Sequence, residues 1–414
     1  MKATQPGVSH TKLAWSWLPW RSVFVLSVLL TLAPSSAVHG GATAASVVVT
    51  NLTALPNGGV QVQALGTGGM VYSFQVSNNL RDWRTLDFTG AESGEAVFQD
   101  PAAAGVSARF YRVRLDPPNT AVWHTNYHGW SNSIVMSNGK VETSIVPAIG
   151  RIMQFRFADH ADGPFWENPK MFGKPPSANS WGTEGSFGGD KVWPSPQSWP
   201  WPPPRGFDSL SYTGTVANGV VTLTGPVDST FGIRVVRRTE LHPTESIMRV
   251  SSTFDKLTGK TNQVGVWVVT QVKDAERVFV PIPDPSIFPK AYTTLGTVPK
   301  GTVVTNGLVS LARDPSSGCK IGNDAGALLW VGTNSVLLIE SPRVPGVPKS
   351  GYPDGGCSAE VYTNPNTAPY IELELLGPLA KLGTNNTLEA TSVYTLFRRT
   401  EATPLDEAKK NLGR

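Results

Sequence analysis

Acidic and aromatic side chains alternate along two late segments of the sequence. In YIELEL, the two-residue period of a β-strand places Tyr370, Glu372 and Glu374 on one face, with aliphatic residues on the other. In SAEVY, Glu360 and Tyr362 share a face in the same way. Such a face is either ordinary surface or the floor of a polar groove. In a groove, carboxylates placed in this way are available for acid–base chemistry.

A second unusual segment, GGDKVWPSPQSWPWPPP at residues 188–204, contains three tryptophans and six prolines. Neither a helix nor a central strand accommodates that many prolines, because each lacks an N–H and has a fixed φ. The segment therefore predicts a stiff loop that carries aromatic rings. Together with two tryptophans that precede this segment, five lie between residues 166 and 201: Trp166, Trp181, Trp193, Trp199 and Trp201.

Aromatic rings of this kind suit a sugar site, because they cover the flat C–H face of a sugar ring. Stiff prolines also lower the cost of ordering the loop on binding. Asp190, Lys191 and Gln197 would then hydrogen-bond the sugar hydroxyls. The alternative is that the rings cap the end of a sandwich and meet no ligand.

The elements that must position these residues are β-strands. Short runs rich in Val, Thr, Ile and Tyr are separated by 41 glycines and 34 prolines, and helical periodicity appears only near the C-terminus, at 404–414. Asn138-Gly139 is a hairpin signal, and the Gly-Thr-Asn-Ser sequence after Val331 marks another. The strands we expect cover 71–76, 109–115, 140–146, 219–224, 232–237, 247–252, 264–269, 328–331, 336–339, 358–362 and 370–375.

A composition change near Asp116-Pro117-Pro118-Asn119 predicts two β domains. Residues 45–116 form a small sandwich, 120–400 one large sandwich, and 401–414 a tail. The small domain resembles fibronectin-type-III-like modules of secreted bacterial proteins through its Asp82-Trp83 turn and its Phe-Tyr-Arg-Val strand. In such a module, Trp83 is expected in the core.

The large domain resembles the galactose-mutarotase-like (aldose 1-epimerase-like) superfamily. The motifs that carry the likeness are Gly150-Arg151, GGDKVWPSPQ, VGVWVVTQV, the CSAEVYTN segment and YIELELLGPL, in this order. The resemblance implies a two-sheet β-supersandwich whose concave face binds sugars. Together with the aromatic cluster, the resemblance gives these sugar-binding candidates: Arg151, Trp181, Asp190, Lys191, Trp193, Gln197, Trp199, Trp201 and Tyr362.

True epimerases pair a carboxylate base with a histidine acid. By position, the resemblance implies Glu360 or Glu372 as the base, so these two are the catalytic candidates, but no histidine here lies in the usual motifs. His124 and His128 flank the start of the large domain, and His242 precedes a proline and is expected in a turn. Lys191 could serve as the acid only if burial or a like charge lowered its pKa. No nucleotide, phosphate or metal motif appears, so no cofactor and no metal is expected.

The N-terminus predicts export. Residues 1–44 contain basic residues, an apolar run and then small residues, as in a signal peptide cleaved after Ala37 or Ala44; a retained anchor is the alternative. Three of the 35 basic residues and none of the 31 acidic residues lie there, which leaves 32 basic and 31 acidic side chains. That balance does not favour nucleic acid, and no membrane span remains after cleavage. The mature chain is expected outside the cell or in the periplasm.

Cys319 and Cys357 are the only cysteines, and their pairing stays open because sequence gives no distance between them. Three functions therefore remain. The first is an exported carbohydrate-binding protein with a sugar groove. The second is a carbohydrate-active enzyme on the same fold, an epimerase or a lyase or hydrolase. The third is a structural or adhesion protein without a small ligand.

Overall fold

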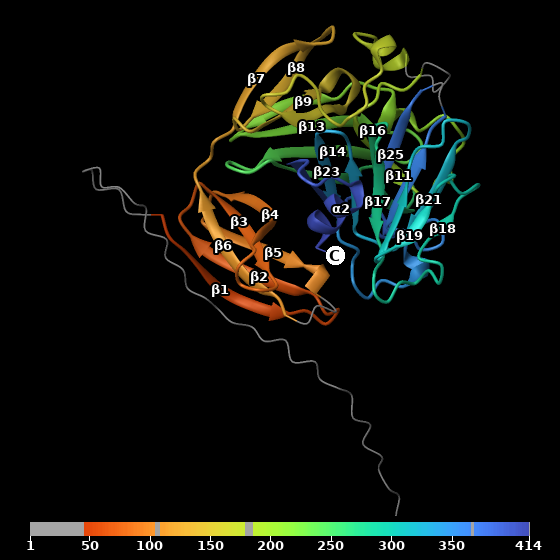
Figure 1. The fold of residues 1–414 in the computed structure, drawn as a ribbon. Helices are drawn as coiled ribbons and strands as arrows, with labels where there is room; N and C mark the ends of the chain where they lie inside the picture. The colour runs from red at the N-terminus through yellow and green to blue at the C-terminus, as the bar shows by residue number, and fades with distance from the viewer. Residues whose placement is uncertain (1–44, 104–107, 179–184, 366–367, 414) are drawn as a thin grey trace, which may run out of the picture.

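The computed structural model describes residues 45–103, 108–178, 185–365 and 368–413. Figure 1 shows that strands dominate these residues, so the predicted all-β class is confirmed. The helices are short: α1 (Arg205–Asp208), α2 (Pro404–Leu412) and the 3-10 turns Pro101–Ala103, Pro147–Ile149, Pro169–Met171, Pro176–Ala178 and Lys349–Gly351. The predicted signal segment, 1–44, lies outside the described residues.

The first six strands form two three-stranded sheets around a small core that includes Val62, Tyr72 and Phe74. One sheet has the order β1 (Val47–Ala54), β2 (Val60–Gly66), β5 (Glu95–Asp100). The other has the order β4 (Arg84–Ala91), β3 (Met70–Ser77), β6 (Phe110–Asp116). Trp83 is only half-buried, contrary to its expected core position. The Arg112 guanidinium lies 4.3 Å from its ring centroid, so the ring packs on a charged side chain at the edge of this part.

The strands from β7 to β27 form two large sheets, which make the predicted two-sheet sandwich. An 11-stranded sheet runs β18 (Thr293–Thr294), β21 (Cys319–Asn323), β24 (Ala359–Thr363), β25 (Tyr370–Leu376), β16 (Asn262–Lys273), β11 (Asp190–Ser195), β10 (Arg151–Phe157), β9 (Val141–Val146), β8 (Trp130–Ser137), β7 (Ala121–Tyr127), with β26 (Ala380–Leu382) beside β16. A 10-stranded sheet runs β12 (Thr213–Ala217), β13 (Val220–Val227), β14 (Ile233–Leu241), β15 (Ile247–Lys256), β27 (Thr387–Arg398), β23 (Ser335–Glu340), β22 (Ala327–Val331), β17 (Arg277–Pro281), β20 (Leu308–Leu311), β19 (Val303–Thr305).

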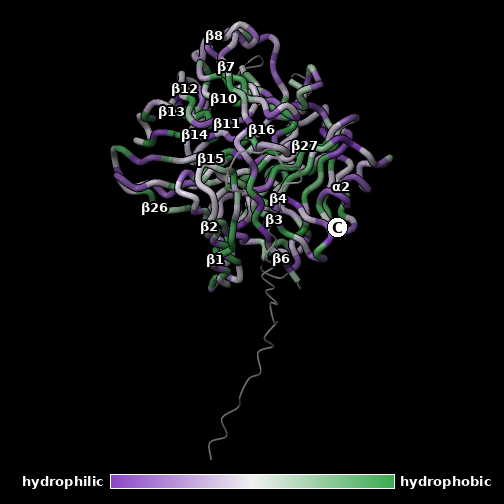
Figure 2. The backbone as a smooth tube through the Cα atoms, turned by 90° about the vertical axis from the view of Figure 1, so that its left-hand side faces the viewer, coloured by the Kyte–Doolittle hydropathy of each residue, from purple (hydrophilic) through white to green (hydrophobic). Residues whose placement is uncertain are grey.

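The main core lies between these two sheets. Phe155 and Leu373 from the 11-stranded sheet and Val235 and Leu337 from the other belong to one buried cluster. Hydrophobic stretches gather along the inner strands in Figure 2, whereas the peripheral loops are mainly hydrophilic. Helix α2 packs through Ala408 on the other face of the 10-stranded sheet. The outer face of the 11-stranded sheet is therefore the one left for a groove.

The aromatic and proline-rich segment is only partly the loop that its composition predicts. Residues 190–195 form β11, a fully buried strand that pairs along its whole length with β16. Its ladder to β10 is a single pair, Ile152 and Asp190. After Asp190, β11 forms no further ladder pairs with β10. Because that side of the strand is unpaired, it tolerates a proline such as Pro194. Residues 196–204 contain neither helix nor strand, as predicted.

Both cysteines are buried and free. The Cys319 thiol lies 3.2 Å from the Thr297 hydroxyl, and the Cys357 thiol lies 3.2 Å from the Asp354 carbonyl. The sequence left their pairing open, and the structure has no disulfide between them.

Charged and apolar contacts connect the small sheets to the large ones. Arg249 on β15 contacts Asp87 on β4 at 2.8 Å, and Phe88 on β4 packs with Ile247 on β15 and Val393 on β27. At the same junction His242 is fully buried, and its Nε2 lies 2.8 Å from the Ser73 hydroxyl.

The hydrogen bonds of His242 determine its protonation state. Its Nδ1 accepts the backbone N–H groups of Thr244 and Glu245, each at 3.1 Å. Nδ1 therefore carries no hydrogen, and the neutral ring donates from Nε2 to Ser73, which in turn donates to Asp116 at 2.8 Å. A proton added to Nδ1 would face two N–H donors.

We therefore expect the free energy of unfolding to fall as pH drops below about 6.5, the ordinary pKa of histidine. Burial lowers the pKa of His242 more than Glu245 and Asp116 raise it, while Arg114 and Lys140 lower it further. The folded state thus favours the neutral ring. The stability this contributes is complete above the unfolded pKa and is lost as pH falls toward the folded one.

Urea unfolding at pH 7.5 and 5.5 measures this loss, and His242→Gln is the comparison because its side chain does not titrate. The pH-dependent loss should be smaller in the variant. Equal losses in both proteins would contradict the role of His242.

Candidate functional site

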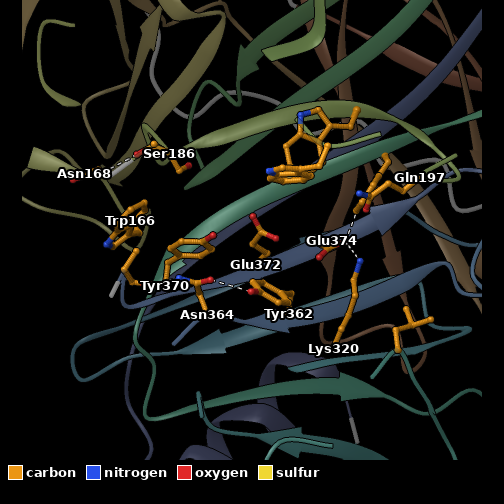
Figure 3. Close-up of a pocket in the computed structure, with 16 residues that line it drawn as sticks. Trp166, Asn168, Ser186, Gln197, Lys320, Tyr362, Asn364, Tyr370, Glu372 and Glu374 are labelled. Atoms are coloured by element: carbon orange, nitrogen blue, oxygen red, sulfur yellow. Dashed lines mark hydrogen bonds and ion pairs between the residues drawn. The ribbon is translucent and has the colours of Figure 1, made fainter. Parts of the chain in front are cut away.

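A cavity of about 500 Å3 opens on the 11-stranded sheet, on the face opposite the main core. The alternation of β25 shows which face this is: Tyr370, Glu372 and Glu374 line the cavity, whereas Ile371 and Leu373 belong to the core. Among the described residues, six aromatic side chains line the cavity, which we name the tryptophan pocket: Trp166, Trp193, Trp201, Trp267, Tyr362 and Tyr370. Its polar lining residues are Asn168, Ser186, Gln197, Lys320, Asn364, Glu372 and Glu374 (Figure 3).

One lysine and two carboxylates form a charged cluster at one end of the pocket, and two of the three, Lys320 and Glu374, line it. Lys320 on β21 has its Nζ 2.6 Å from a carboxylate oxygen of Glu360 and 2.7 Å from one of Glu374. Glu360 and Glu374 are direct cross-strand partners on β24 and β25, so the strand register brings two carboxylates together. Trp267 also donates its indole N–H to Glu374 at 2.7 Å.

These contacts shift the protonation of all three groups. Burial raises the pKa of Glu374 to about 8, and the opposing effect of Lys320 is offset by Glu360 and Glu372. Burial likewise raises the pKa of Glu360 against Lys320. Burial acts to lower the pKa of Lys320, but the two carboxylates together outweigh it and raise that pKa. The lysine therefore stays charged while the carboxylate pair tends to retain a proton.

Glu372 lies at the centre of the pocket floor. It accepts a hydrogen bond from the Gln271 amide at 3.0 Å, and the Lys191 Nζ lies 3.7 Å from the same carboxylate oxygen. Burial and the nearby Arg151 charge lower the pKa of Lys191 to about 8, against the effect of Glu372. The depressed pKa that the sequence could not reveal is therefore present, but Lys191 is only 1% exposed and lies beneath the pocket.

The aromatic rings that form the pocket walls pack against one another. The Trp193 ring meets Trp267 edge to face, with centroids 5.3 Å apart, and meets Trp201 at 6.2 Å. Trp166 packs against Tyr370 at 4.8 Å. Trp201 is 51% exposed, in contrast to the buried Trp193 and Trp267. It is therefore the ring most open to a ligand among the described tryptophans of this wall.

The pocket brings together some of the residues that the sequence singled out. Trp193, Gln197, Trp201, Tyr362 and Glu372 line it. Trp181 lies outside the described residues. The others, Arg151, Asp190, Lys191, Trp199 and Glu360, do not line it, contrary to expectation.

Each residue outside the pocket is held by buried partners. Arg151 contacts Asp208 at 2.5 Å and donates to the Gly188 carbonyl at 2.7 Å. Asp190 points toward the 10-stranded sheet, where Arg237 contacts it and the Tyr394 hydroxyl donates to it at 2.7 Å.

Trp199 and Glu360 are also buried. The Trp199 indole N–H donates to the Pro194 carbonyl at 3.0 Å, so this ring supports the wall without lining it. Glu360 is on the predicted face of β24 but lies under Lys320 with no exposed surface, which leaves Glu372 as the sequence-predicted carboxylate in the pocket.

Several lining residues were not among the candidates. Tyr370 and Glu374 share the face of Glu372, so the period of the strand contained their signal. Trp267 alternates with core valines in VGVWVVTQV and could have been found in the same way. Lys320 carries no local signal, because its position depends on β21 pairing with β24.

No histidine is among the described lining residues, and no group of three His, Cys, Asp or Glu side chains placed to hold a metal occurs in the described ranges. None of the described helices is long and apolar enough to cross a membrane.

No protein-family model matches the sequence, and no curated protein is significantly similar to it. Among solved structures, a galactose mutarotase-like protein from Lactobacillus casei is similar at 11% identity and a TM-score of 0.45, over 64% of this chain and 100% of that one. One from Clostridium acetobutylicum is similar at 9% identity and a TM-score of 0.42, over 68% and 99%. A galactose mutarotase related enzyme from Lactobacillus acidophilus is similar at 9% identity and a TM-score of 0.41, over 65% and 97%. The solved structures that the chain resembles thus include galactose mutarotase-like proteins.

Proposed function

We propose that the protein binds a carbohydrate in the tryptophan pocket. The observation that carries the proposal is the mixture of groups in one cavity of about 500 Å3: six aromatic rings and seven polar side chains. Volumes of this size are typical of sites for small molecules. A sugar is the class of ligand that presents both an apolar ring face and many hydroxyls.

The geometry supports distinct roles for the two kinds of group. Trp201 and the Trp166–Tyr370 pair offer ring faces for the C–H surface of a sugar. Glu372 on β25 and Asn364, which follows the end of β24, offer acceptors and donors for hydroxyls. The carboxylates and Lys320 neutralise one another in part, so the pocket suits a neutral sugar better than an anion. With residues 1–44 as a signal segment, we propose that binding takes place after export.

The direct test is a screen of monosaccharides, uronic acids and short plant or algal oligosaccharides by thermal shift, followed by calorimetry of the hits. A ligand at about 100 times its Kd stabilises the folded state by about 2.7 kcal/mol. Trp201→Ala should weaken binding of a hit by about tenfold or more, equivalent to about 1.4 kcal/mol.

Trp123→Ala is the matched control, because Trp123 is 42% exposed and lies on β7, away from the pocket. Neither variant should change the unligated melting temperature by much, since both rings are largely exposed. A Trp201→Ala protein that binds as well as Trp123→Ala would overturn the proposed site, and a lower unligated melting temperature would favour the capping role of the loop.

One observation favours a second function, epimerase-type catalysis. Glu374, whose pKa burial raises to about 8, lies two positions from Glu372 on the same face of β25. An acid that keeps its proton at neutral pH and a second carboxylate in one pocket are the two groups that ring opening and closing need. Polarimetry of freshly dissolved glucose and galactose tests this function. Mutarotation that is accelerated by the protein and abolished by Glu372→Gln would establish it.

A further inference from the structure

A second cavity, of about 360 Å3, lies beside the tryptophan pocket and has no role in the function proposed above. Its lining includes Tyr127, His128, Arg156, Glu167, Phe172 and Lys273. We name it the Glu167 pocket. It combines aromatic rings with groups that can donate and accept hydrogen bonds, as the tryptophan pocket does.

Strand β16 shows that both pockets open on the same face of the sheet. Along β16 every second residue points to that face: Trp267 lines the tryptophan pocket, Gln271 bonds Glu372, and Lys273 lines the Glu167 pocket. The residues between them, Val268 and Val272, belong to the main core. A ligand on this face can therefore reach both cavities without crossing the sheet.

The register of β16 and β25 also makes the pockets neighbours. Lys273 of the Glu167 pocket is the direct cross-strand partner of Tyr370 in the tryptophan pocket. Side chains of such partners begin about 5 Å apart. The segment at 166–168 contributes to both pockets: Trp166 and Asn168 line the tryptophan pocket, and Glu167 lines the Glu167 pocket.

Glu167 is held in a polar arrangement at the second pocket. It accepts the Tyr127 hydroxyl at 2.9 Å and the Gln154 amide at 3.1 Å, and the His128 Nε2 lies 3.8 Å from the oxygen that Tyr127 contacts. Burial raises the pKa of Glu167 to about 7 against these hydrogen bonds and the Lys273 charge. A carboxyl group that is partly protonated near neutral pH can both donate to and accept from a hydroxyl.

The pocket's other charged groups balance one another. Lys273 contacts Asp162, and Arg156 contacts Glu142 at 2.8 Å. The surface offered to a ligand therefore suits a neutral, hydroxyl-rich molecule.

His128 occupies a backbone position that normally favours other residues. It has a φ of +49° and precedes Gly129 at +93° in the turn between β7 and β8. Two successive positive φ values favour Asn-Gly in such a turn. The imidazole is stacked on Phe172, with centroids 4.0 Å apart and an interplanar angle of 4°, and burial lowers its pKa. The turn and the stack fix a neutral aromatic donor at the rim of the pocket.

We propose that the two pockets form one groove for an oligosaccharide, with one sugar unit in the tryptophan pocket and the next in the Glu167 pocket. This inference rests on the proposed function and specifies its ligand as a chain of at least two neutral sugar units. Trp166, Tyr370, Glu167 and Lys273 then surround the linkage between the two units.

The test compares chain lengths within three series: glucose and cellotetraose, xylose and xylotetraose, and galactose with its β-1,4-linked tetrasaccharide. Calorimetry of the full mature chain should give at least a tenfold lower Kd for the tetrasaccharide than for the monosaccharide in one series. Glu167→Gln and His128→Asn should each remove most of that gain and leave monosaccharide binding unchanged. Asn at 128 keeps the preference for a positive φ.

Trp201→Ala and Glu389→Gln are the comparison variants, since Trp201 lines the other pocket and Glu389 is an exposed residue of β27 outside both. Trp201→Ala should weaken mono- and tetrasaccharide alike, and Glu389→Gln should change neither. Melting curves without ligand establish whether each variant is folded. If either Glu167→Gln or His128→Asn does not fold, the other of the two carries the test.

The outcomes separate the two claims. A tetrasaccharide that binds no more tightly than its monosaccharide overturns the shared groove while the sugar site stands. Pocket variants that leave the gain intact, or that weaken monosaccharide binding equally, also overturn it. If no member of these series and no sugar of the wider thermal-shift screen binds, the proposed function itself fails, and the groove with it.

Discussion

Replacing Asp190 by alanine is expected to lower the free energy of unfolding by about 3–5 kcal/mol, the cost of leaving a buried charge without its partner. Asp190 has no exposed surface and receives the Arg237 guanidinium together with the Thr270 hydroxyl at 2.6 Å and the Tyr394 hydroxyl at 2.7 Å. Arg237 is itself 1% exposed, so its charge would remain in the interior. Urea or guanidinium unfolding of the variant measures the loss.

Asp159→Ala is the matched control for this result. Asp159 also pairs with an arginine, Arg398, at 2.6 Å, but both side chains are more than half exposed, and solvent screens such pairs. This variant should unfold almost as the parent protein does. A stable Asp190→Ala protein that has lost sugar binding would contradict the structural role and restore the sequence prediction that Asp190 bonds sugar hydroxyls.

Replacing Lys320 by methionine is expected to have the second large effect, also about 3–5 kcal/mol near neutral pH. Methionine keeps most of the side-chain volume but removes the cation that holds Glu360 and Glu374. Two buried carboxylates without a cation relieve their repulsion by binding a proton, which raises their folded pKa values further above the ordinary value of about 4.3.

The sign of the pH dependence follows from that shift. A carboxyl group whose folded pKa is raised binds more protons in the folded state, so its cost grows as pH rises above the unfolded pKa. Glu374 of the parent protein already has a pKa of about 8, so the stability difference between the parent protein and Lys320→Met should grow as pH rises past that value and be larger at pH 9 than at pH 7. Unfolding curves at the two pH values measure it.

A double-mutant cycle with Glu374→Gln tests whether the loss of stability in Lys320→Met arises from the missing charge. Since glutamine removes one of the two charges, the double variant should be more stable than Lys320→Met alone. Losses that simply add, or that do not depend on pH, would show that Lys320 acts through packing rather than through its charge.

Local sequence patterns were sufficient to predict the strands. The Asn138-Gly139 turn lies between β8 and β9, with Gly139 at a φ of +84°, and the two strands around the Gly-Thr-Asn-Ser turn pair as predicted. The short C-terminal helix lies at Pro404–Leu412. These features depend on side-chain period and turn chemistry, which are encoded within a few residues of one another. The boundaries of the small and large parts and the signal segment remain predictions.

Composition was misleading where tertiary contacts outweigh local preference. The prolines of the segment at 188–204 favoured a loop, yet Asp190–Ser195 lies beside β16 in the middle of the large sheet. Polar residue types were equally ambiguous. Asp190 and Gln197 both looked suited to hydroxyls, but Asp190 faces the interior and Gln197 the pocket.

The sequence by itself determined the all-β class, most strand positions, and the face of β25 that carries Tyr370, Glu372 and Glu374, because each depends on the two-residue period of a strand. Only the tertiary structure decided which charged residues meet. Strand pairing joins Lys320 to Glu360 and Glu374, and places Lys273 opposite Tyr370. These contacts connect residues 40 to 97 positions apart, and the pairing of distant strands is set by how the two sheets pack rather than by any local pattern.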